Sequence, residues 1–203
     1  MISEKYNYLF VHRGKSGGNS ISEALLPFSE AEKVVDPRFQ DGIDRFGVVN
    51  RSFGTTKHST LADYKQLVPA EIFDRLYKFT ILRNPYDRLV SAFFAPHRVA
   101  EGLSTAFSKD RFIDLMRQQH TLRHMICLSD DEPITAHMHT ILRFEHLNED
   151  FAALCKQLCI PATSLPHRNK GTRRPYQEYY DQDTIAVVER LFGEELELGQ
   201  YSF

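Results

Sequence analysis

Short, mostly apolar runs alternate along the chain with longer stretches in which apolar residues recur every three or four positions. The short runs cover 6–12, 77–82 and 140–144, and their aromatic and β-branched residues predict buried strands. The longer stretches have the periodicity of amphipathic helices. They cover residues 19–26, 60–68, 70–76, 86–94, 108–119, 145–158 and 181–192. Strands that alternate with helices predict an α/β domain with a mainly parallel sheet flanked by helices.

Two of the predicted strands end in a basic turn that leads directly into a helix. The first turn contains Lys15, Ser16, Gly17, Gly18, Asn19 and Ser20. The first N–H groups of a helix have no intrahelical partner and bind anions, and glycine lets the backbone approach an anion closely. The second turn, Arg83-Asn84-Pro85, follows the strand 77–82. Because the carboxyl ends of parallel strands lie at one edge of a sheet, we expect two neighbouring anion sites.

The region between these two units is harder to assign. Residues 28–56 predict a long excursion, with a short strand at 34–35 and a loop around 48–49. Excursions of this length in compact α/β domains are often functional. Further along, Cys155 and Cys159 lie four residues apart on a predicted helix, and we expect both to be buried as small hydrophobic side chains.

Composition narrows the class of function. The chain has 203 residues and a formal net charge of −2, so its overall charge does not predict nucleic-acid binding, and an anion site must be a local basic cluster. No apolar run approaches the roughly 20 residues that span a bilayer, and the first residues lack the features of a secretory signal. The chain has only three cysteines, and such a small, odd number does not indicate a disulfide framework. We therefore expect a cytoplasmic protein that forms one domain, with no integral membrane segment.

The first turn partly matches the P-loop of nucleotidases, G-x-x-x-x-G-K-[ST]. Gly14-Lys15-Ser16 supplies the last three positions, but Leu9 stands where the pattern requires a glycine. No predicted strand ends in an Asp suited to holding Mg²⁺, which such enzymes require. A nucleotide kinase or nucleotidase is therefore the weaker alternative.

The same turn resembles the 5′-phosphosulfate loop of sulfotransferases, in the branch that includes carbohydrate (heparan-type) sulfotransferases. Members commonly carry F-x-H-x-P-K-T-G-G-T-S-I, and residues 10–21 read F-V-H-R-G-K-S-G-G-N-S-I. Residues 79–93 resemble the family's 3′-phosphate motif, F-x-x-V-R-[ND]-P-Y-x-R-L-x-S. Residues 142–147 resemble its R-F-E-x-L segment, and the stretch from 166 to the terminal 201–203 resembles its basic loop and tail. The first loop departs from the family pattern at Gly14, Ser16 and Asn19.

This resemblance implies a P-loop-like, three-layer α/β domain over residues 1–203 and a donor, 3′-phosphoadenosine 5′-phosphosulfate (PAPS). It implies transfer of a sulfuryl group, without a metal, to a hydroxyl or amine of a carbohydrate or small metabolite. The short chain fits a soluble, bacterial-type member. The resemblance fades over 28–56 and 96–138, which we expect to shape the acceptor pocket.

The resemblance also implies the residues that contact the donor. At the 5′ end these are Lys15, Ser16, Gly17, Gly18, Asn19 and Ser20, with Lys15 stabilising the charge that grows on the bridging oxygen. At the 3′ end they are Arg83, Ser91, Lys170, Gly171, Thr172 and Arg173. Arg83 has a second interpretation, an ion pair with a carboxylate, and Arg88 is equally suited to such a pair.

The acceptor must lose a proton, and histidine is the usual general base near neutral pH. His58 precedes a predicted helix, and in related carbohydrate sulfotransferases a histidine in a comparable segment serves as the base. His12 is the next candidate, although its position at a strand end suits a structural hydrogen bond. A third hypothesis for the chain is a non-catalytic binder of phosphorylated or sulfated ligands.

Overall fold

The computed structural model describes residues 1–35, 46–95, 106–161, 165 and 173–203. A four-stranded sheet with the order β1-β2-β6-β7 lies at its centre. β2 (Tyr8–Phe10), β6 (Tyr77–Leu82) and β7 (Thr140–Arg143) run parallel, and β1 (Ile2–Ser3) runs antiparallel to β2. The predicted α/β class is thus confirmed, and the sheet is small and mixed because the N-terminal residues add an antiparallel edge strand.

The register of the sheet brings the two basic turns to the same edge. Phe10 pairs with Phe79, and the N–H of Val11 donates to the carbonyl oxygen of Phe79 at 2.9 Å. β2 and β6 therefore end side by side, and the chain leaves each of them into a helix. These helices are α1 (Gly18–Leu25), which continues as the 3-10 turn η1 (Leu26–Phe28), and α4 (Pro85–Phe93).

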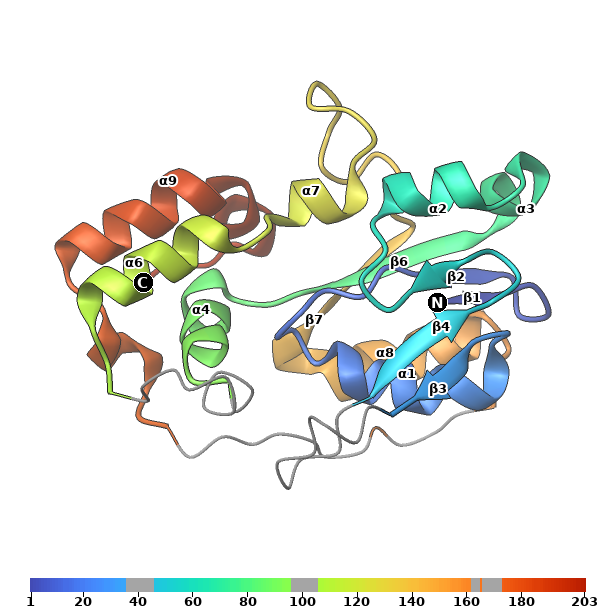
Figure 1. Ribbon diagram of the computed structural model, residues 1–203, viewed down its shortest axis with the longest axis horizontal. Helices are drawn as coiled ribbons and strands as arrows, with labels where there is room; N and C mark the ends of the chain where they lie inside the picture. Colours follow the sequence, from blue (N-terminus) through green and yellow to red (C-terminus); the bar gives the residue numbers. More distant parts are fainter. Residues whose placement is uncertain (36–45, 96–105, 162–164, 166–172) are drawn as a thin grey trace.

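Helices cover both faces of the sheet (Figure 1). On one face, α1 and α8 (Leu147–Gln157) pack through Ile21 and Phe151 onto Phe10 and Phe79, and the 3-10 turn η3 (Phe144–His146) precedes α8. On the other face lie α2 (Leu61–Leu67), α3 (Ala70–Arg75) and α7 (Leu122–Ile126), which pack onto Leu9 and Val11 of the first strand segment. Burial of both faces accounts for the nearly continuous apolar runs of the strands.

A separate helical cluster lies beside the sheet (Figure 1). It contains α4, α6 (Lys109–Gln118), the 3-10 turn η4 (Tyr176–Tyr179) and α9 (Gln182–Gly199). Tyr86, Phe112 and Phe192 are its largest buried side chains. α9 is interrupted at Phe192, whose φ of −127° and ψ of 22° are not helical.

Most predicted elements are confirmed to within a few residues. Thr60 caps α2, and Asp63 completes the capping box. The loop predicted at 48–49 is wrong: β4 (Gly47–Asn50) pairs antiparallel with β3 (Glu32–Val34) and β5 (Thr55–Thr56) in a second sheet. Local propensity misses this strand because it is stabilised by burial of Val48 against the main core.

Two further differences concern helix ends. α9 continues to Gly199, well beyond its predicted end at 192, because the chain resumes a helical path after the interruption. α8 ends at Gln157, so Cys159 adopts a positive φ of 54° beyond the helix and is exposed, contrary to prediction, whereas Cys155 is buried. Within the described ranges, every helix is too short or too polar to cross a membrane.

Candidate functional site

The first basic turn has a backbone that only certain residues accommodate. Gly17 is the N-cap of α1, with φ 80° and ψ 4°, and Lys15 also has a positive φ, 65°. A Cβ atom at Gly17 would lie 2.7 Å from Cδ2 of Leu147. Glycine adopts this conformation freely, whereas a lysine there costs about 1–3 kcal/mol and is most often found at functional sites. The turn therefore stores strain at the residue that carries its positive charge.

The donor groups of this turn fit an anion. Ser16 is fully buried, and its hydroxyl has no hydrogen-bond partner among the described residues. A buried hydroxyl without a partner costs about 1–3 kcal/mol, so it points to a missing acceptor. Asn19 and Ser20 lie half-buried in the first turn of α1, at the positive end of the helix dipole, and the N–H of Ser20 donates to the carbonyl oxygen of Gly17 at 3.0 Å. The arrangement suits a phosphate or sulfate oxygen.

His12 lies under this turn and links it to His58. A Cβ atom at Gly18 would lie 2.6 Å from Cε1 of His12, so the imidazole requires glycine at that position. Nδ1 of His12 lies 3.3 Å from Oγ of Ser22, as expected of a structural hydrogen bond. The His58 ring meets the His12 ring edge-on, with centroids 5.6 Å apart. The loop between β5 and α2 thereby brings the candidate base beside the first turn.

Both imidazoles are held in the neutral form. Burial is the main cause that lowers the pKa of His12 well below its usual value, and the charge of Lys57 adds to it. The side chain of His58 is exposed on one side, but partial desolvation and then the charge of Lys57 lower its pKa as well. A neutral, accessible imidazole is able to accept a proton at pH 7.

The second basic turn holds Arg83 at the end of β6. Its Nε and Nη2 donate to Oδ2 of Asp87 at 2.9 and 2.5 Å, and its Nη1 donates to the carbonyl oxygen of Lys15 at 2.5 Å. The guanidinium also lies 3.9 Å from the ring centroid of Phe144. The ion pair with a carboxylate, the second interpretation of Arg83, is therefore present in the structure. These three bonds leave N–H groups of the five-donor guanidinium for a further acceptor.

Asp87 bridges two arginines. Nη2 of Arg173 donates to its Oδ1 at 2.5 Å, and Nη1 donates to its backbone carbonyl at 3.2 Å. Arg173 is thereby held beside Arg83, although ninety residues separate them in the chain. Ser91 lies half-buried one helical turn after Asp87, on the same face of α4. The other predicted members of this cluster, Lys170, Gly171 and Thr172, lie outside the described residues.

An ion pair behind the first turn was not predicted. Nη2 of Arg13 donates to both carboxylate oxygens of Glu195 at 2.6 Å, and both side chains are 2% exposed. Oε1 of Glu195 also accepts the N–H of Leu122 at 2.7 Å. The chain carries no local pattern for this pair, because 182 residues separate its members.

Arg88 is buried next to this pair. Burial, followed by the charge of Arg13, lowers the pKa of Arg88 to about 9. Its guanidinium lies 5.1 Å from the ring centroid of Phe192, and among the described residues its Nε and Nη2 have no hydrogen-bond partner. The carboxylate partner expected for Arg88 is thus replaced at these atoms by the face of an aromatic ring.

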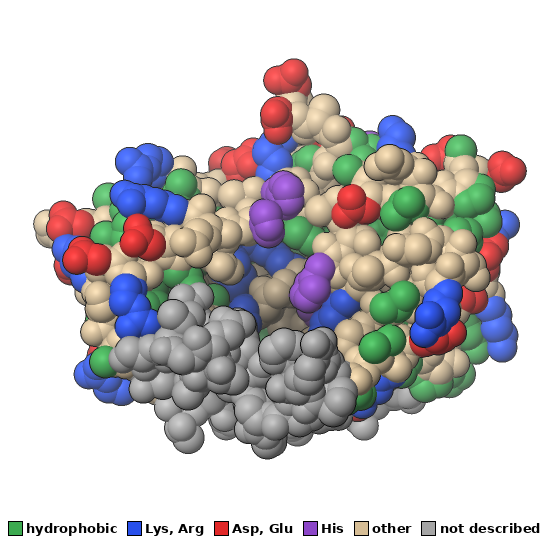
Figure 2. Space-filling model, in the orientation of Figure 1, with side chains coloured by type: hydrophobic (Ala, Val, Ile, Leu, Met, Phe, Trp, Pro, Cys, Tyr) green, Lys and Arg blue, Asp and Glu red, His purple; other side chains and the backbone are tan. Residues whose placement is uncertain are grey.

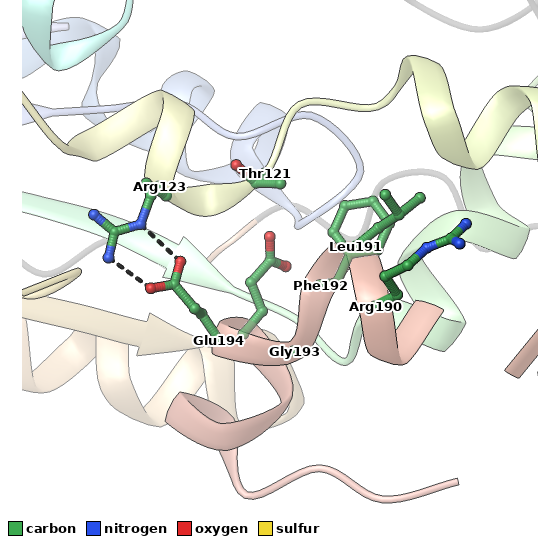
Figure 3. Close-up of a pocket in the computed structure, with 8 residues that line it drawn as sticks. Thr121, Arg123, Arg190, Leu191, Phe192, Gly193 and Glu194 are labelled. Carbon is green, nitrogen blue, oxygen red and sulfur yellow. Dashed lines mark hydrogen bonds and ion pairs between the residues drawn. The ribbon is translucent and has the colours of Figure 1, made fainter. Parts of the chain in front are cut away.

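The surface between the helical cluster and the sheet is hollowed, with Lys and Arg side chains in its depth and His side chains at its rim (Figure 2). A cavity of about 360 Å³ lies at the interruption of α9, lined by Thr121, Arg123 and residues 190–195 (Figure 3). Within it, Nη2 of Arg123 pairs with Glu194 at 2.5 Å. The lining of this cavity includes neither Lys15 nor Arg83, so the chemistry of the two turns lies elsewhere.

Comparison with known proteins gives one match. The model of a family described as the sulfotransferase family matches residues 1–202. The match includes both basic turns, the candidate base and the C-terminal helix. No curated protein and no solved structure matches the chain.

Proposed function

The chain belongs to the sulfotransferase family, and we propose that it transfers the sulfuryl group of PAPS to a hydroxyl or amine of a carbohydrate or small metabolite. The observation that carries this proposal is the bond between Arg83 and the carbonyl oxygen of Lys15. PAPS has anionic groups at the 5′ and 3′ ends of one ribose, so a protein must bind two separated anions at a fixed spacing. Two basic turns that are joined by a hydrogen bond meet this requirement.

In this proposal the first turn binds the 5′ end. The backbone N–H groups at the start of α1 and the hydroxyls of Ser16 and Ser20 donate to phosphate and sulfate oxygens. Gly17 leaves room for Leu147 and Gly18 leaves room for the His12 ring, so the turn keeps the backbone path that the anion needs, and Asn19 offers a further donor. The unpartnered hydroxyl of Ser16 supports this assignment best, because it needs an acceptor.

The second turn binds the 3′-phosphate. Arg83 and Arg173 share Asp87, which holds the two guanidinium groups together against their mutual repulsion. Ser91 adds a hydroxyl from the same helix face. Lys170, Gly171 and Thr172, which precede Arg173 in the chain, complete this site in the proposal.

PAPS supplies the sulfuryl group and leaves as adenosine 3′,5′-bisphosphate. As the acceptor oxygen bonds to sulfur, the electron pair of the breaking S–O bond passes to the bridging oxygen. The ammonium of Lys15 stabilises the charge that develops there, and such preorganised charge is often a large part of catalysis. His58, kept neutral by desolvation and by Lys57, takes the proton from the acceptor.

The fold supports the proposal in a general way. Helices on both faces of β2, β6 and β7, together with two strand–turn–helix units, fit a P-loop-like, three-layer domain with a mainly parallel sheet. All three cysteines are unpaired, which is in keeping with the cytoplasmic location that we propose.

Ligand-dependent thermal stability tests the proposal. Adenosine 3′,5′-bisphosphate at a hundred times its dissociation constant would stabilise the protein by about 2.7 kcal/mol, which raises the Tm by several degrees. ATP and GTP with Mg²⁺ are the comparison ligands, and transfer of ³⁵S from labelled PAPS to a panel of sugars and small alcohols or amines follows. A Tm that rises with ATP or GTP but not with adenosine 3′,5′-bisphosphate would overturn the proposal.

A further inference from the structure

We propose that Glu195 is a positioning residue for the donor, which acts through its buried ion pair with Arg13 on the turn that contains Lys15. This inference rests on the proposed function, because it assigns that turn to the 5′ end of PAPS. Glu195 comes from the far end of the chain and has no place in the family motifs of the first turn. Its effect on the site is indirect, since its carboxylate bonds to Arg13 and to the backbone N–H of Leu122.

The ion pair restrains the start of the turn. Arg13 directly precedes residues 14–17, and Lys15 follows two residues later with its positive φ. At Lys15 itself the carbonyl oxygen accepts the hydrogen bond from Arg83. The turn is therefore attached at two points, on one side to α9 through Glu195 and on the other to β6 through Arg83. A strained lysine needs such external restraint to keep its conformation.

The interruption of α9 lies between two contacts to buried arginines. Phe192, the non-helical residue, packs against the guanidinium of Arg88 on α4. Glu195, three residues later, receives Arg13. One short segment of α9 thus contacts two buried arginines. Arg13 precedes the first basic turn, and Arg88 lies on α4, the helix that follows the second turn. The position of this segment couples the C-terminal helix to both anion sites.

Stability alone is a poor explanation for this pair. Among the described residues, Nε and Nη1 of Arg13 have no hydrogen-bond partner, so the buried charge is only partly compensated. Replacing a buried ion pair by well-packed hydrophobic side chains of similar volume is often neutral or stabilising, whereas removing one partner is strongly destabilising. The pair is therefore expected to contribute orientation of the turn more than folding free energy.

Three variants test the inference. Glu195→Gln keeps the acceptor for Leu122 but removes the charge that binds Arg13. Glu194→Gln is the matched control, because Glu194 is half exposed and pairs with Arg123 instead (Figure 3). The double variant Arg13→Met/Glu195→Gln leaves neither charge buried without its partner, so we expect it to fold even if Glu195→Gln alone does not.

Each variant is measured for Tm, for the Kd of adenosine 3′,5′-bisphosphate by calorimetry, and for hydrogen exchange of the backbone N–H groups of residues 14–20. We expect the double variant to keep a Tm near that of the unmodified protein while its Kd rises about tenfold, which is about 1.4 kcal/mol. We also expect faster exchange at residues 14–20 in this variant and in Glu195→Gln. Glu194→Gln should leave the Kd and the exchange unchanged.

Two results would contradict the inference, and they are distinguishable. If the unmodified protein binds the nucleotide and the double variant binds it equally well with unchanged exchange, the pair is structural only and the proposed function stands. If the unmodified protein itself does not bind adenosine 3′,5′-bisphosphate, the proposed function fails and this inference fails with it.

Discussion

Nη1 of Arg83 donates a hydrogen bond to the carbonyl oxygen of Lys15 at 2.5 Å. The arginine assigned to the 3′-phosphate thus holds the backbone of the lysine assigned to the bridging oxygen. This bond couples the two proposed anion sites, so we expect a change at one turn to affect the other. This relationship sets the expectations for the variants below.

Arg83→Ala should weaken binding of adenosine 3′,5′-bisphosphate and also lower kcat. Loss of a charged hydrogen bond costs about 1.5–3 kcal/mol, or about ten- to a hundredfold in Kd. Calorimetry gives the Kd, and transfer of labelled sulfate at saturating donor gives kcat. Arg75→Ala is the control, because Arg75 forms an exposed pair with Glu4 on the surface. Equal affinity in Arg83→Ala and the control would exclude Arg83 from the 3′ site.

Lys15→Ala should reduce kcat by about a hundred- to a thousandfold, as expected when one stabilising donor at a developing charge is lost. The Kd for adenosine 3′,5′-bisphosphate should change little, because that product lacks the sulfuryl group beside which Lys15 acts. Single-turnover transfer at saturating PAPS separates the two quantities. Lys65→Ala, at an exposed residue of α2, serves as the control. A kcat within threefold of the unmodified enzyme would remove Lys15 from the mechanism.

The rate should depend on pH through His58. Desolvation and the nearby charge of Lys57 lower the pKa of His58 below 6.5. The base acts when neutral, so kcat/KM should rise with pH up to that lowered pKa and stay level above it through pH 7. His58→Gln should abolish this acidic limb and lower kcat by about a hundredfold or more. His146→Gln, at an exposed histidine before α8, should keep the limb. Persistence of the limb in His58→Gln would assign the base to another group.

Gly17 and Gly14 are expected to differ in how well they tolerate a Cβ atom. Gly17→Ala should destabilise the protein by about 1–3 kcal/mol and abolish nucleotide binding, because φ is 80° and the new Cβ would lie 2.7 Å from Leu147. Gly14→Ala should be tolerated, since no atom lies within 4 Å of a Cβ at that position. Urea unfolding measures both stabilities. Equal stability of the two variants would show that the turn rearranges easily.

Features that depend on neighbours in the sequence were predictable. Tyr77–Leu82 is a strand over the predicted residues, and Thr60 and Asp63 form the predicted capping box, because both depend on contacts within a few positions. For Arg83 the sequence indicated an ion pair with a carboxylate as one interpretation, and the structure identifies that carboxylate as Asp87. The family motifs then supplied expectations for the two basic turns.

Features that depend on distant segments were not predictable. Val48 forms a strand because the core buries it, although its neighbours favour a loop. Arg173 reaches Asp87 across 86 residues and Arg13 reaches Glu195 across 182, and no periodicity connects such residues. Exposure of Cys159 follows from the end of α8, two residues earlier, which depends on tertiary packing.

The separation of Arg13 from Glu195 has a consequence for biosynthesis. A ribosome adds about 5–20 residues per second, so the 182 residues between them take roughly 9–36 s to make. During this time the nascent chain has a first turn whose arginine lacks its counterion. A ribosome-bound chain that stops before α9 should therefore fail to retain the nucleotide, and the competence to bind it should be acquired only after the last helix emerges.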